Sequence, residues 1–287
     1  MDMDEVAPLI FILFFGLMAC LKLGVSMAGD ELSVLFVALF LAYAVWRKWY
    51  SRLFRVFAPG CPAWHRGLLA IIPPLCVVTL AWSVRRFDSP EVRESVGYIF
   101  LFSAVGAVTL GLALPLLNVL GFDVLGQAVA QGNAAALPPI VGAWLASTAL
   151  NIGANTGEGA TIYTALGPLA VAGVLLAVFA FAAAALTGAT HSITSGRESA
   201  AGIRFGALLL AASLPLARAA AGDWVSIGAC GRKFALAAPV LLILLALGWL
   251  AERIMAGRRG WLQAGVLPAA AFLIVADAFR TVPSHRR

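Results

Sequence analysis

Long apolar stretches alternate with short polar breaks along the whole chain. A helix needs about 20 predominantly apolar residues to cross the hydrocarbon core of a membrane. Nine candidate stretches lie at about 6–23, 32–46, 67–84, 96–120, 135–154, 162–187, 200–220, 234–251 and 262–279. The pattern predicts an all-α, polytopic transmembrane helical bundle of eight or nine spans. The lower number applies if 67–84, which contains Pro73 and Pro74, dips into the membrane and returns on the same side.

The segment 46–57 has a different pattern, because large apolar and basic residues alternate at helical spacing. The apolar residues recur at 46, 49, 50, 53, 54 and 57 and share one helical face. This spacing predicts an in-plane amphipathic helix with its basic face toward anionic lipid and its aromatic face toward the acyl chains. The alternative is a solvated basic linker. The predicted lipid-interface residues are Trp46, Arg47, Lys48, Trp49, Arg52 and Arg55.

A two-helix pattern occurs twice in residues 131–252. Each copy has a polar and small-residue opening, a span, a glycine–acid pair and a second span with a proline near its start. The openings are 132–136 and 198–202, the pairs are Gly157-Glu158 and Gly222-Asp223, and the prolines are Pro168 and Pro239. An even number of spans per copy gives both hairpins the same orientation, as in parallel repeats. We therefore expect a pseudo-repeated four-helix core, the alternative being that biased composition imitates a repeat.

Composition supports a membrane class throughout the chain. Of the 287 residues, 62% are hydrophobic and 12% are charged, whereas soluble domains have roughly 45–50% apolar and 25% charged residues. The prediction therefore has no soluble domain: an N-terminal membrane region at 1–130, a tandem-hairpin core at 131–252, and a final span with a short polar tail at 253–287. The net charge of +6 suggests contact with anionic membrane lipids rather than with nucleic acid.

The sequence shows no established catalytic or metal-binding pattern. His65, His191 and His285 lie far apart, and the four cysteines are scattered without metal-ligand spacing. We predict that the protein is not an enzyme and that it needs no metal or cofactor.

A polar cluster near the ends of the repeated hairpins is the predicted binding site. It consists of Asn151, Asn155, Glu158, Arg218 and Asp223. Asn151 and Asn155 are four residues apart and share a helical face. Polar residues at membrane depth usually turn toward a partner or a wet cavity. If the hairpins are related by a two-fold-like axis, both acidic turns lie on one side of the membrane and form a mouth for a cation, or an Arg–carboxylate latch. The alternative is that both acids lie in solvated turns.

Glycine pairs mark candidate close contacts between helices. Gly202 and Gly206, like Gly153 and Gly157, have the spacing that lets two helices approach closely. The first pair is the better candidate, for a contact within the chain or for a homo-oligomer.

The order of features in 132–250 resembles the YjfL-type family of small bacterial inner-membrane proteins. The residues that carry this resemblance are Gly132 to Ala136, Arg197 to Gly202, and Leu214 through Arg218 to Asp223. The resemblance implies two related hairpins and a multi-pass location in the bacterial inner membrane, and it implies no biochemical activity. Residues 1–130 and the last span fall outside it.

Two functions remain open from the sequence. The first is a transporter or channel for a small solute or ion, with a path at the predicted polar cluster. The second is a non-transporting scaffold that organises lipid or a partner through 46–57.

Overall fold

The structure is a computed structural model that describes residues 29–55, 61–157, 162–223 and 226–255. All regular elements in these ranges are helical. They are α2 (Gly29–Arg55), α3 (Ala63–Phe87), α4 (Pro90–Glu94), α5 (Val96–Val119), the π-helix η1 (Gly126–Ala130), the 3-10 helix η2 (Ala134–Ala136), α6 (Leu137–Asn155), α7 (Tyr163–Thr187), α8 (Ala189–Thr194), α9 (Ser199–Ala220) and α10 (Ile227–Met255).

Seven helices in the described ranges are long and apolar enough to cross a membrane: α2, α3, α5, α6 together with η2, α7, α9 and α10. They coincide with the seven spans predicted between 32 and 251. The first and last predicted spans, 6–23 and 262–279, lie outside the described residues. The segment at 67–84 belongs to one uninterrupted helix, α3, so the fold favours a full span there over a re-entrant loop.

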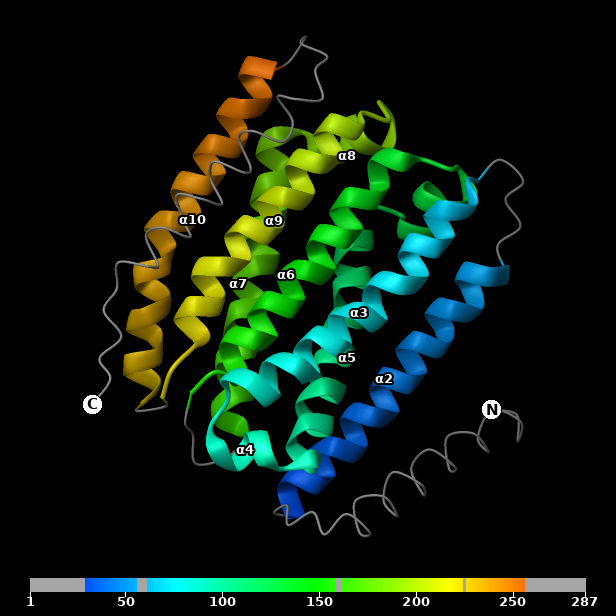
Figure 1. The fold of residues 1–287 in the computed structure, drawn as a ribbon. Helices are drawn as coiled ribbons and strands as arrows, with labels where there is room; N and C mark the ends of the chain where they lie inside the picture. Colours follow the sequence, from blue (N-terminus) through cyan, green and yellow to red (C-terminus); the bar gives the residue numbers. More distant parts are fainter. Residues whose placement is uncertain (1–28, 56–60, 158–161, 224–225, 256–287) are drawn as a thin grey trace.

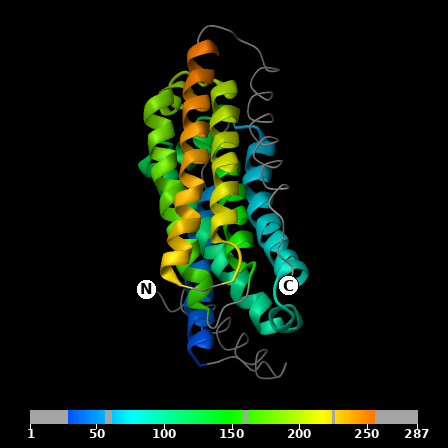
Figure 2. The same ribbon diagram turned by 90° about the vertical axis from the view of Figure 1, so that its left-hand side faces the viewer.

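Consecutive long helices run in opposite directions through the bundle (Figure 1). One end, which we call the α4 end, holds α4, the start of α2 and the C-termini of α6 and α9. The other, the α8 end, holds α8, η1, η2 and the C-terminus of α2. Helix α6 is central and packs against α3, α5, α7 and α9, whereas α2 lies outside α5. Helix α10 covers α9 and α7 on the opposite flank, the flank turned toward the viewer in Figure 2.

Helices α6 and α9 form the most extensive contact in the bundle, and they run parallel. Glycines without side chains bring their backbones together, because a Cβ on Gly142 would overlap Gly206 and a Cβ on Gly153 would overlap Ala217. The offset in sequence is the same near both ends of the contact, as a parallel pair requires. The glycine spacing in 202–206 therefore predicted a real close approach.

The same contact corrects the expected oligomer surface. Gly202 packs against the backbone of Ala135, and Gly206 against that of Pro138. Both glycines are buried inside the chain, so their small-residue face is already occupied by α6 and η2. It is not available to a second copy.

Two helices that pack on α9 complete the second half of the core asymmetrically. Helix α7 contacts both α6 and α9, while α10 contacts α9 and α7. Arg204 of α9 holds α10 through a two-pronged ion pair with Glu252, with Nε–Oε1 and Nη2–Oε2 distances of 2.6 and 2.7 Å. The parallel course of α6 and α9 agrees with the expected orientation of the two hairpins, and the origin of the core as a repeat stays a prediction.

The expected in-plane helix at 46–57 is wrong for its described part. Residues 46–55 continue α2 without a break (Figure 1). Trp46 and Trp49 of their aromatic face pack into the bundle, whereas Phe54 is exposed. Trp49 is 5% exposed and meets Trp144 edge-on, while the Trp46 indole N–H donates to Ala107 O at 2.9 Å. Helix packing and membrane-surface binding use the same apolar stripe, so spacing alone does not separate them. The basic residues Arg47, Lys48, Arg52 and Arg55 are exposed, as expected.

A contact from Tyr50 of α2 explains how α3 tolerates Pro74, one of its two internal prolines. Pro74 has no N–H, so the carbonyl four residues earlier, Ala70 O, has no partner within the helix. The hydroxyl of Tyr50 donates to this oxygen at 3.0 Å. A neighbouring helix thus supplies the hydrogen bond that a proline removes inside a membrane.

Candidate functional site

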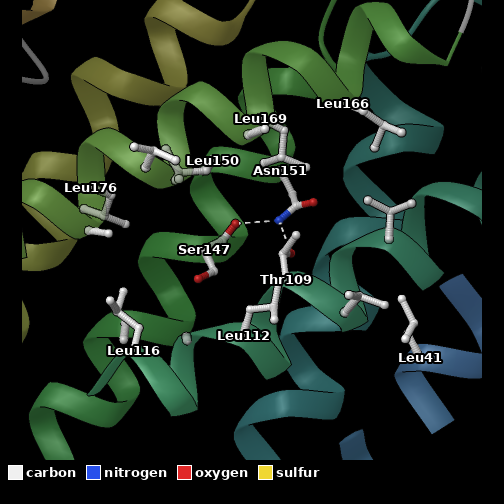
Figure 3. A pocket seen from close by; sticks show the side chains of 18 of the residues that line it. Leu41, Thr109, Leu112, Leu116, Ser147, Leu150, Asn151, Leu166, Leu169 and Leu176 are labelled. Carbon is white, nitrogen blue, oxygen red and sulfur yellow. Dashed lines mark hydrogen bonds between the residues drawn. The ribbon is translucent and has the colours of Figure 1, made fainter. Parts of the chain in front are cut away.

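A cavity of about 590 Å³ lies within the bundle and is of a size that suits a small ligand. Its walls come from α2, α5, α6 and α7, with Leu209 added from α9. The lining is almost wholly aliphatic, and Figure 3 shows leucines of α2, α5, α6 and α7 around it. Its volume falls within the roughly 300–1,000 Å³ range of small-molecule sites.

The cavity is open on the side of the bundle. Lining residues that are also exposed lie on α2 (Val37, Leu41), α5 (Leu112) and α7 (Val174). They belong to helices of membrane-spanning length, so this opening is at the depth of the hydrocarbon core. We call this cavity, with its opening between α2 and α7, the lateral groove.

Three polar side chains interrupt the aliphatic lining: Thr109, Ser147 and Asn151. Asn151 Nδ2 donates to Thr109 Oγ1 at 2.7 Å and to Ser147 O at 2.8 Å. The Thr109 hydroxyl donates in turn to Gly106 O at 2.9 Å. Asn151 is fully buried, and its Oδ1 has no hydrogen-bond partner among the described residues. Asn151 Oδ1 is therefore an enclosed acceptor that faces Gly106 of α5.

The predicted polar cluster is only partly brought together. Asn151 and Asn155 share a buried face of α6, as expected. Arg218, in the last turn of α9, and Asp223, after it, are exposed, and they are not among the residues of the groove. Glu158 lies outside the described residues. The polar groove residues that the predicted cluster did not include are Thr109 and Ser147, whose hydroxyls lie in mainly apolar spans.

The turns after α6 and α9 do meet at the α4 end. The Gly222 N–H donates to Thr156 O at 2.6 Å, and a Cβ on Gly157 would overlap the backbone of Gly222. The glycines of the two glycine–acid pairs are thus neighbours, which agrees with the expectation that both turns lie on one side. Whether a cation or a latch uses them stays a prediction.

The connection between α5 and α6 is held by the polar opening of the first hairpin. Asn133 is buried, accepts from Ala135 N–H at 3.1 Å and caps η2. Its Nδ2 donates to Ile193 O in α8 at 2.8 Å and to Gln127 Oε1 at 3.0 Å. This asparagine therefore joins the loops at the α8 end, and its role is structural.

A second, smaller cavity of about 340 Å³ lies near the α8 end, beside the basic face of α2. Lys48, Trp49 and Arg52 line it from α2, and Asn118 and Asp123 line it from the end of α5 and the following loop. It places two cations and one carboxylate near the membrane surface, a setting suited to a lipid headgroup.

The described residues show no cluster of three or more His, Cys, Asp or Glu side chains that would hold a metal ion. His65 is buried, with Nδ1 3.0 Å from Ala128 O. Cys61, Cys76 and Cys230 are free thiols.

Comparison of the chain with protein-family models, with curated proteins and with solved structures gives no match.

Proposed function

We propose that this chain is a multi-pass protein of the bacterial inner membrane that takes a small apolar or amphiphilic molecule into the lateral groove and transports it. The observation that supports this most is the groove itself: a cavity of about 590 Å³ with an aliphatic lining and a lateral opening. An ion or a sugar would lose its hydration there without gaining partners. The sequence predicted a small solute or ion, and the aliphatic lining favours a substrate that partitions into lipid.

The features that carry the YjfL-type resemblance support the proposed location rather than the transport. Gly132 to Ala136 and Arg197 to Gly202 open α6 and α9, the parallel pair at the centre of the bundle. The groove uses α6 from this pair, together with helices on both sides of it.

Filling the groove tests the proposal. Gly173 of α7 lines the groove, and a Cβ there would meet no described atom within 4 Å. Gly173→Leu therefore introduces a side chain into the cavity without a backbone clash. Gly167→Leu is the matched control, because Gly167 is also unobstructed in α7 but is not part of the groove lining.

The assay is movement of a fluorescent amphiphile across proteoliposome membranes, with each variant at the same protein-to-lipid ratio. We expect Gly173→Leu to slow the movement and Gly167→Leu to leave it at the wild-type rate. Movement that is the same with and without protein would refute the proposed transport.

A second function, organisation of anionic lipid without transport, is supported by a different surface. Arg47, Lys48, Arg52 and Arg55 are exposed along the end of α2, where each basic residue near an anionic membrane surface contributes roughly 1 kcal/mol of attraction. Replacing all four by serine should release anionic lipid that co-purifies with the protein. If the lipid content stays at the wild-type level, α2 does not serve this function.

A further inference from the structure

The second cavity, near the α8 end, has a basic wall that lacks a counter-charge partner. Lys48 and Arg52 of α2 line it, and both side chains are exposed. They are four residues apart and share one face of the helix. Two like charges at this spacing destabilise a helix, and in the described part of the chain neither forms an ion pair. An anion held between these two side chains is therefore stabilising.

Two further polar groups set the net charge of the cavity and add a donor. Asp123 lines it, and its Oδ1 accepts from the Gly126 N–H at 3.1 Å, which holds the carboxylate in place. Asn118 is exposed and also lines the cavity. Its Oδ1 accepts from the Val124 N–H at 3.1 Å, which leaves Nδ2 as a donor. Two cations and one carboxylate amount to one net positive charge, which matches a ligand with a single negative charge.

The position of the cavity along the bundle favours a ligand from the membrane. Helix α2 has 27 residues and is therefore about 40 Å long, whereas the hydrocarbon core is roughly 30 Å thick. Arg52, three residues from the end of α2, reaches the level of the headgroups. Lys48, one turn deeper, reaches the same level with its long side chain.

The wall nearer the membrane centre is apolar. Val45 of α2 and Leu112 of α5 line the cavity on that side, and Leu112 is 57% exposed on a helix of membrane-spanning length. A phosphate at the basic wall therefore leaves room for an acyl chain along a surface that faces lipid. Free phosphate would gain nothing from this apolar wall.

Resting on the second function proposed above, we infer that the second cavity binds one monoanionic phospholipid, whose phosphate is held by Lys48 and Arg52. A glycerol headgroup fits the polar groups of the cavity, because its hydroxyls can donate to the Asp123 carboxylate. Arg47 and Arg55 carry the same charge at the same end of α2 but do not line the cavity. They attract anionic lipid in general, whereas Lys48 and Arg52 select one molecule.

The test counts the lipids bound to the full chain in detergent by native mass spectrometry. Phosphatidylglycerol and phosphatidylethanolamine with identical acyl chains are added in turn, because both contain a phosphate but only the first has a net negative charge. We expect the wild type to bind one phosphatidylglycerol at a concentration about tenfold lower than phosphatidylethanolamine requires, as for roughly one unit of charge near basic residues.

Two double variants locate the source of this preference. Lys48→Gln with Arg52→Gln should abolish it. Arg47→Gln with Arg55→Gln is the matched control, because it removes the same charge from the same helix end outside the cavity, and it should keep the preference.

Three results would overturn the inference. An equal loss in both double variants would indicate attraction to the whole basic surface, and it would leave the second function standing. A preference that survives Lys48→Gln with Arg52→Gln would exclude the cavity as its source, again without refuting the second function. A wild type that binds both lipids equally would overturn both, and this comparison is decisive even if a variant does not fold.

Discussion

Adding one methyl group at Gly142 tests the close contact between α6 and α9. A Cβ on Gly142 would lie 2.6 Å from Gly206 Cα and 2.7 Å from its carbonyl carbon, whereas ordinary contact begins near 3.4 Å. Both obstacles are backbone atoms, so no side-chain rotation relieves the overlap. The helices must move apart by roughly 1 Å, and a gap of that size forfeits about a quarter to a half of the dispersion energy of each contact it opens.

We therefore expect Gly142→Ala to lower the free energy of unfolding by about 1–3 kcal/mol, the usual range for overpacking. The measurement is reversible unfolding in mild detergent, followed by tryptophan fluorescence. Gly167→Ala is the control, because a Cβ at Gly167 meets no described atom within 4 Å. It should be neutral or stabilising, since alanine exceeds glycine in helix propensity by about 1 kcal/mol.

The double variant with Gly206→Ala sharpens this prediction. Gly206 faces the carbonyl of Pro138 in the same contact, so one separation of the helices accommodates both methyl groups. The combined loss of stability should be smaller than the sum of the two single losses, as for residues that share a contact. If Gly142→Ala were as stable as Gly167→Ala, the close-contact reasoning would be refuted.

Three further perturbations test other contacts. Tyr50→Phe removes the donor to Ala70 O in α3 and should destabilise by about 1–3 kcal/mol in the same unfolding assay, whereas Tyr163→Phe, at an exposed side chain, should not. Glu252→Gln breaks the part-buried pair with Arg204 and should destabilise α10 by about 2 kcal/mol, between the surface and buried limits; unchanged hydrogen exchange in α10 would contradict this. Burial raises the pKa of Asp88, beyond the end of α3, to about 6, above the unfolded value of about 3.9. The folded state therefore favours protonated Asp88, and the stability gained from this is complete below pH of about 4 and lost as pH rises through about 6. The measurement is the melting temperature between pH 4 and 7. If it varied with pH in Asp88→Asn as it does in the wild type, the assignment to Asp88 would be wrong.

The span positions followed from sequence because lipid imposes a simple rule. Each helix must satisfy its own backbone and present about 20 apolar residues, so apolar length alone locates α5, α7 and α9. Pro73 and Pro74 left α3 ambiguous, because the hydroxyl that replaces the hydrogen bond lost at Pro74, that of Tyr50, lies on another helix. Only the fold shows that contact.

The candidate site was predictable only in part. Asn151 is conspicuous as a polar residue in an apolar span, and the sequence reasoning selected it. Its pairing with Thr109 joins α5 to α6, and nothing in the sequence fixes which faces of two spans meet. Arg218 and Asp223 belong to the end of α9, and polarity near a span end does not distinguish a site from a solvated turn.

The α6–α9 contact also constrains how the protein can move. The backbones of these two helices are in direct contact without intervening side chains, so we expect α6 and α9 to move as one rigid unit. By contrast, the apolar window of α2 is 17% buried, against 67% for that of α6. For the proposed transport, the groove therefore has a closely packed wall at α6 and a less confined wall at α2. The attachment of α2 to α5 and α3 includes the hydrogen bonds of Trp46 and Tyr50.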